Sequence, residues 1–171
     1  MKHKKLVLSA FFITLGLLLP FIGGQIPEIN SIFLPMHLPI LICGFICGWK
    51  YGAVVGFITP LLRTTLFGFP LFPVALSMAF ELCTYGIICG FLYNKLRKSK
   101  LSTYLTLIIA LIAGRLIRTC AAAVIFGVMG TEFTFSVFLT GLFIEAIPGI
   151  ILQFILVPFV INIYENMGLF S

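Results

Sequence analysis

The chain has 171 residues and a formal net charge of +6, yet only 9% of its residues are charged while 61% are apolar. Because a water-soluble domain has about a quarter of its residues charged, this composition excludes a soluble globular protein and predicts an integral membrane protein. The positive charge does not indicate nucleic-acid binding, since most basic residues lie in short runs between apolar spans, as the positive-inside rule describes.

Six apolar segments predict an all-α bundle of six transmembrane helices, forming a single domain over residues 1–171. The first segment follows a basic start and resembles a signal peptide, but it is long for one and no cleavage site follows it, so a retained helix is expected. The second is about 20 Å long, too short to span about 30 Å of hydrocarbon unaided. The expected helices cover residues 6–22, 35–48, 52–67, 73–94, 102–127 and 135–164.

An even number of spans places both termini on the same side of the membrane. Eight of the eleven basic residues then fall on that side, including the four in the loop at residues 95–100. Because short cytoplasmic loops carry an excess of Lys and Arg, this side is expected to be the cytoplasm. The sequence therefore predicts a multi-pass protein of the cell membrane with both termini cytoplasmic.

Charged residues inside the apolar segments are the most informative feature of the sequence. A charge at the centre of a helix in lipid costs roughly 2.5–3.5 kcal/mol on insertion scales, so such residues indicate a functional site. Counting along each helix places all of these charged residues in the outer half of the membrane or at its midplane, at comparable heights. Tyr85 shares a helix face with one of them, Glu81. The five charges are Arg63, Glu81, Arg115, Arg118 and Glu145.

Two interpretations of these charges stay open. They are either structural Arg–Glu pairs that hold the bundle together, or a binding site in which three arginines and two glutamates leave one positive charge for an anionic ligand. His37, at the outer start of the second helix, and Gln25 and Asn30, in the loop at residues 23–31, are further candidates for substrate contacts. Gln153 is expected to form a hydrogen bond across helices.

Catalysis is not predicted. The chain has no Asp, which excludes the paired-aspartate metal sites of membrane phosphotransferases, and it has no H-E-x-x-H, G-x-S-x-G or Walker motif. The five cysteines lie in apolar stretches without a C-x-x-C pair, so we interpret them as small packing residues. We therefore expect a binding protein without a cofactor or metal site, and one that cannot hydrolyse ATP itself.

Pairs of small residues one helical turn apart permit close contact between helices. Most are interpreted as packing within the bundle, whereas the pair on the first helix could dock another membrane subunit. The pairs are Ala10…Thr14, Gly44…Gly48, Gly52…Gly56 and Gly86…Gly90.

Several motifs are shared with a known family. They are Leu34-Pro35-Met36-His37-Leu38-Pro39, Gly44, Gly48, Tyr51-Gly52, Pro60-Leu61, Gly68-Phe69-Pro70, Phe72-Pro73, Glu81, Gly114-Arg115 and Ala146-Ile147-Pro148-Gly149. With them, the chain resembles the substrate-binding S components of energy-coupling factor (ECF) vitamin transporters, and within that family it is most similar to the members assigned to pantothenate.

The resemblance implies a high-affinity vitamin binder that works with a transmembrane coupling subunit and two ATPase subunits. It also implies that the loop between the first two helices gates the site, and that Ala10 and Thr14 meet the coupling subunit. Thr14 departs from the Ala-x-x-x-Ala spacing that family members often carry. The alternatives are a different water-soluble vitamin or small anionic metabolite such as folate, a membrane assembly subunit without a transport role, or a membrane enzyme.

Overall fold

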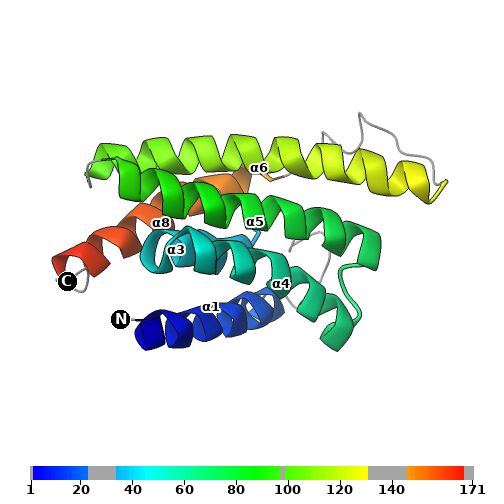
Figure 1. Ribbon diagram of the computed structural model, residues 1–171, viewed down its shortest axis with the longest axis horizontal. Helices are drawn as coiled ribbons and strands as arrows, with labels where there is room; N and C mark the ends of the chain where they lie inside the picture. Colours follow the sequence, from blue (N-terminus) through cyan, green and yellow to red (C-terminus); the bar gives the residue numbers. More distant parts are fainter. Residues whose placement is uncertain (1, 23–33, 97–98, 131–145, 168–171) are drawn as a thin grey trace.

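The computed structural model describes residues 2–22, 34–96, 99–130 and 146–167, which form an elongated bundle of helices (Figure 1). No strand occurs in these ranges, in agreement with the all-α fold expected from the apolar segments. The helices are α1 (Lys2–Ile22), α3 (His37–Cys47), α4 (Trp49–Phe67), α5 (Phe72–Lys95), α6 (Lys100–Val128) and α8 (Ile147–Asn166).

Four of these helices, α1, α5, α6 and α8, are long and apolar enough to cross a membrane. The other two, α3 and α4, are not, and α3 has only 11 residues. The last helix begins at Ile147 instead of near residue 135, because the ring of Pro148 fits the first turn of a helix but blocks its continuation from preceding residues. The part of the expected helix before Ala146 lies outside the described residues.

The short helix α3 forms the centre of the bundle. Nine of its 11 residues are buried, and it packs against α1, α4, α5 and α8. A helix that is apolar on every side is stable only where it is surrounded, which explains how a helix too short to span the membrane is accommodated. Cys43 and Cys47 of α3 and Cys89 of α5 are buried free thiols, as expected for small packing residues, whereas Cys83 is partly exposed and Cys120 is exposed.

Glycines bring α4 and α5 into backbone contact. A Cβ added at Gly52 would lie 2.8 Å from Gly86 O and 2.8 Å from Gly44 Cα, and one added at Gly86 would overlap the Gly52 backbone. Likewise, a Cβ at Gly56 would overlap the carbonyl of Leu82. The interpretation of these spacings as packing within the bundle is therefore confirmed, and the contact fixes the register of the two antiparallel helices.

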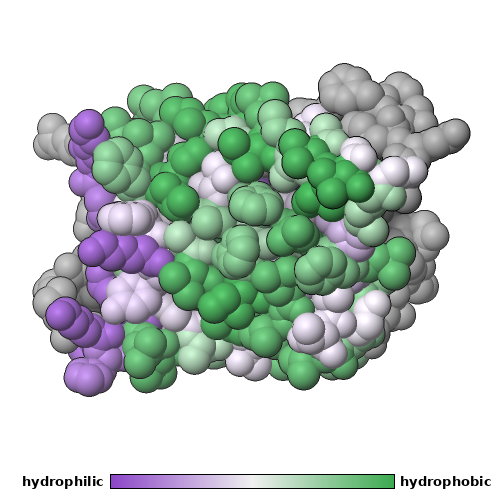
Figure 2. All heavy atoms as spheres, turned by 45° about the vertical axis from the view of Figure 1, so that its right-hand side comes forward, coloured by the Kyte–Doolittle hydropathy of each residue, from purple (hydrophilic) through white to green (hydrophobic). Residues whose placement is uncertain are grey.

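Polar residues gather at one end of the bundle. The start of α1, the end of α8 and the link between α5 and α6 all lie at this end (Figure 1), and Figure 2 shows hydrophilic residues there and a mostly apolar surface elsewhere. Tyr93 of α5 donates a hydrogen bond to Glu165 of α8 at the same end. Lys50 lies 5.5 Å from the Trp49 ring, a cation–π contact. This distribution suits a protein whose apolar flanks face lipid.

Candidate functional site

The carboxylate of Glu81 is the centre of a polar cluster inside the bundle. Its side chain is 1% exposed. Tyr85 donates a hydrogen bond of 2.7 Å to Oε1, and Nη1 of Arg118 donates one of 2.9 Å to Oε2. Nε2 of His37 lies 3.5 Å from the same Oε2. These four side chains, here called the Glu81 cluster, come from α3, α5 and α6.

A glycine lets α6 approach closely enough for this cluster to form. A Cβ at Gly114 would overlap the ring of Tyr85, so only glycine permits the approach. Arg118 lies one turn further along α6 and reaches Glu81. The rings of His37 and Tyr85 lie 5.8 Å apart, and Arg115 also interacts with Tyr85. The cluster thus joins α3, α5 and α6, and Arg115, one turn before Arg118 on α6, contacts it through Tyr85.

In the cluster, the charge of Glu81 is compensated, whereas the ring nitrogens of His37 lack hydrogen bonds to the described residues. An ionised carboxylate is stable inside a bundle only where a countercharge and hydrogen bonds compensate its lost hydration. Arg118 and Tyr85 supply this compensation to Glu81. His37 is 1% exposed, yet neither of its ring nitrogens has a hydrogen-bond partner within the described ranges. Arg118 and Tyr85 therefore compensate the charge of Glu81 inside the bundle, while Nδ1 of His37 has no hydrogen-bond partner among the described residues.

Arg63 lies apart from the Glu81 cluster. Its Nη1 donates a hydrogen bond of 2.8 Å to the carbonyl of Leu17 in α1, and its guanidinium lies 5.5 Å from the ring of Phe21. Gly56 of α4 packs on Leu82 of α5, the residue next to Glu81. Arg63 lies two helical turns beyond Gly56, so it is roughly 10 Å further than Glu81 from the end of the bundle where the polar residues gather. The structure does not place these two charges at the comparable heights expected from the sequence.

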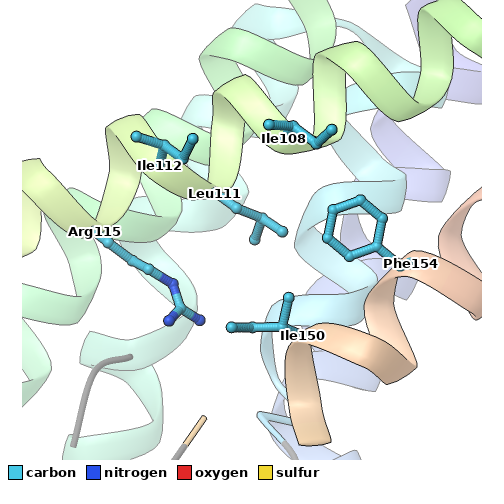
Figure 3. Close-up of a pocket in the computed structure, with 6 residues that line it drawn as sticks. All are labelled: Ile108, Leu111, Ile112, Arg115, Ile150 and Phe154. Atoms are coloured by element: carbon cyan, nitrogen blue, oxygen red, sulfur yellow. The ribbon is translucent and has the colours of Figure 1, made fainter. Parts of the chain in front are cut away.

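A hollow of about 220 Å³ lies between α6 and α8 (Figure 3), and one of its lining residues, Arg115, also interacts with Tyr85 of the cluster. Among the described residues, Arg115 is the one charged residue that lines it; this side chain is 3% exposed and extends its guanidinium toward Ile150 (Figure 3). A carboxylate suits the planar guanidinium, and apolar walls suit a hydrocarbon group. The surface of the hollow is almost wholly apolar and therefore suits a hydrocarbon group, with the buried guanidinium of Arg115 beside it. Its lining residues are Ile108, Leu111, Ile112, Arg115, Ile150 and Phe154.

The remaining candidate residues have different positions. Ala10 and Thr14 are both exposed on α1, where the Thr14 hydroxyl donates a 3.0 Å hydrogen bond to the Ala10 carbonyl. Gln25, Asn30 and Glu145 lie outside the described residues. In the described part of the chain, no three His, Cys, Asp or Glu side chains gather as ligands of a metal ion would.

Gln153 of α8 differs from its expectation. It is 0% exposed, but neither its amide oxygen nor its amide nitrogen has a hydrogen-bond partner among the described residues. The hydrogen bond across helices that its position predicts is therefore not present in these ranges. Apolar lining residues such as Ile150 and Phe154 were not singled out from the sequence, because they carry no signal in a chain that is 61% apolar.

Long apolar helices packed around a buried polar cluster are typical of a helical membrane protein. The family model for the substrate-specific component of ECF transporters matches residues 4–161, so the chain belongs to this family. A search of curated proteins and a search of solved structures each found no match. Membership confirms the family resemblance and assigns the chain to transport, as a substrate-binding subunit that works with a coupling subunit and ATPase subunits.

Proposed function

We propose that this chain is the high-affinity vitamin-binding S component of an ECF importer in the cell membrane, and that its substrate is the monoanionic vitamin pantothenate. The observation that carries the proposal is Arg115, a buried arginine at a hollow whose other lining residues, in the part of the chain that the structure describes, are apolar. Arginine binds a carboxylate through two parallel hydrogen bonds, which a lysine cannot reproduce. An apolar wall beside it suits the dimethyl group of pantothenate.

The neighbouring Glu81 cluster supports the same assignment. Tyr85 interacts with Arg115, and the two ring nitrogens of His37 make no hydrogen bond within the described ranges. These groups can bind the hydroxyl and amide groups of pantothenate. Gln25, Asn30 and Glu145 complete the proposed contacts from outside the described residues.

The proposed mechanism is binding without catalysis. The substrate enters from the outer face, and its carboxylate pairs with Arg115 in a site of low dielectric, where the pairing is strong. Because the chain has no nucleotide-binding motif, ATP hydrolysis takes place in the two ATPase subunits. The transmembrane coupling subunit links that hydrolysis to movement of the loaded S component.

Calorimetry with pantothenate on the purified protein in detergent tests the proposal. Loss of a charge-assisted partner costs a few kcal/mol, so Arg115→Ala is expected to weaken binding by roughly 10- to 1,000-fold. Arg63→Ala is the matched control, because it removes a buried guanidinium that bonds to α1 instead of lining the hollow. An equal loss of affinity in both variants would exclude the hollow as the carboxylate site.

The ligand itself distinguishes the alternatives. Tight binding of a neutral or cationic vitamin, with no binding of pantothenate, would refute the charge argument. Folate binding would keep the anionic class and change the substrate. A protein that binds no small molecule would favour a membrane assembly subunit, for which the satisfied Glu81–Arg118 pair is the supporting observation.

A further inference from the structure

The buried amide of Gln153 is not explained by packing. One face of α8 is buried at every fourth residue, and the residues on that face are Gly149, Gln153, Val157 and Ile161. Leaving a buried amide without hydrogen bonds destabilises the folded protein, and the hydrocarbon region offers no water to compensate. Val157 and Ile161 on the same face show that apolar residues fit there. The amide of Gln153 therefore calls for a partner other than the described residues.

Counting along the helices places Gln153 near the level of the Glu81 cluster. Tyr93 is a common reference point, because its ring lies 4.9 Å from the ring of Phe45 in α3 and its hydroxyl bonds to Glu165 in α8. His37 lies eight residues before Phe45, roughly 12 Å along α3, and Gln153 lies twelve residues before Glu165, roughly 18 Å along α8. Since α3 packs against α8, Gln153 and His37 are separated by about one helical turn in height.

Gln153 is also next to the hollow. Ile150 and Phe154, which line the hollow from α8, lie three residues before it and one residue after it. At 3.6 residues per turn, Gln153 is rotated about 60° from Ile150 around the helix. Arg115 faces the same hollow from α6 (Figure 3). A substrate whose carboxylate binds Arg115 can therefore extend toward the amide of Gln153.

We infer that Gln153 is a substrate-contacting residue that selects ligands carrying a secondary amide, whose N–H donates a hydrogen bond to the side-chain oxygen of Gln153. A glutamine side chain offers a carbonyl acceptor and an NH₂ donor. Because the N–H and C=O of a trans secondary amide point in opposite directions, the side-chain oxygen of Gln153 accepts from the substrate N–H, and its NH₂ group is left for a second polar group of the ligand, such as a hydroxyl. A site built to bond such a group rejects analogues that lack it, because its own buried polar atoms would stay unpaired. This inference rests on the proposed function and specifies the part of the substrate that lies beyond the carboxylate.

Calorimetry with pantothenate on Gln153→Leu tests the inference. The expected result is a Kd raised at least tenfold, with a Tm of the ligand-free protein that is unchanged or higher, because an unpartnered buried amide has been removed. Val157→Ala, one turn along the same face, is the matched control: it should lower the Tm and leave the Kd within about twofold. An unchanged Kd for Gln153→Leu would overturn the inference.

An ester analogue of pantothenate, which lacks the amide N–H, distinguishes a direct contact of Gln153 with the substrate from an indirect effect of the substitution on helix packing. Wild-type protein should bind the analogue less tightly than pantothenate, whereas Gln153→Leu should bind the two equally. An equal loss for the analogue in both proteins would show that Gln153 does not contact the amide.

A wild-type protein that does not bind pantothenate would refute the proposed substrate, but the inference would still be tested. The readout is then the small molecule that wild-type protein retains through purification, detected by mass spectrometry. Loss of that molecule in Gln153→Leu would support the inference, and its retention would overturn it. A wild-type protein that retains nothing and binds nothing would overturn both proposals.

Discussion

Replacement of Arg118 by methionine tests the buried pair at the centre of the bundle. Glu81 is 1% exposed and accepts hydrogen bonds from Arg118 and Tyr85 at 2.9 and 2.7 Å. Removal of one partner from a buried ion pair costs about 3–5 kcal/mol, because the other charge is left uncompensated. Since 1 kcal/mol shifts the Tm of a protein of this size by about 2–4 °C, Arg118→Met should lower the Tm of the ligand-free protein by roughly 6–20 °C.

The double variant Glu81→Gln/Arg118→Met should recover most of this loss, because replacement of both charges of a buried pair is often neutral. Thermal unfolding of the wild type, both single variants and the double variant in the same detergent gives the coupling of the pair. Lys100→Met, which removes an exposed charge at the start of α6, is the control and should change stability by less than about 0.5 kcal/mol. If the loss of stability in the double variant equals the sum of the losses in the two single variants, the proposed interaction between Glu81 and Arg118 is refuted.

Three further predictions concern orientation, partner and packing. In a cysteine-free background, a thiol at position 131 should be labelled from outside intact cells and one at position 98 should not, because the positive-inside rule predicts that the basic loop faces the cytoplasm. The reverse pattern would refute the orientation. Ala10→Trp should abolish uptake in cells while calorimetry shows unchanged ligand affinity, since Ala10 is exposed on α1 and the bulky ring blocks docking; full uptake would exclude this docking face. Gly86→Leu should lower the free energy of unfolding by at least about 1–3 kcal/mol, because its side chain would overlap the Gly52 backbone. Gly127→Ala, with no atom within 4 Å of the added carbon, should not destabilise the protein, and equal losses would refute the packing argument.

Helix periodicity explains which parts of the site were predictable. Glu81 and Tyr85 are four residues apart, so any helix through them places both side chains on one face, and they form a hydrogen bond in the structure. Arg115 and Arg118 are three residues apart on α6, and both interact with members of the Glu81 cluster. Such local relations depend on helix geometry alone.

Relations between helices were less predictable. Arg63 bonds to a backbone carbonyl 46 residues earlier in the chain, and every residue offers such an acceptor, so no side-chain pattern signals the contact. The hollow depends on how α6 and α8 cross, and its apolar lining does not stand out among the many apolar residues of the chain. The start of α8 at Ile147 follows from Pro148, but strong apolar character on both sides of that proline favoured one long helix.

The most direct test of the substrate-binding account is the identity of the small molecule that the protein retains. Protein purified from cells grown in rich medium would be denatured, and the released fraction analysed by mass spectrometry beside an Arg115→Ala preparation. The account predicts pantothenate at close to one molecule per wild-type chain and far less from Arg115→Ala. Absence of any retained small molecule in both preparations would contradict it.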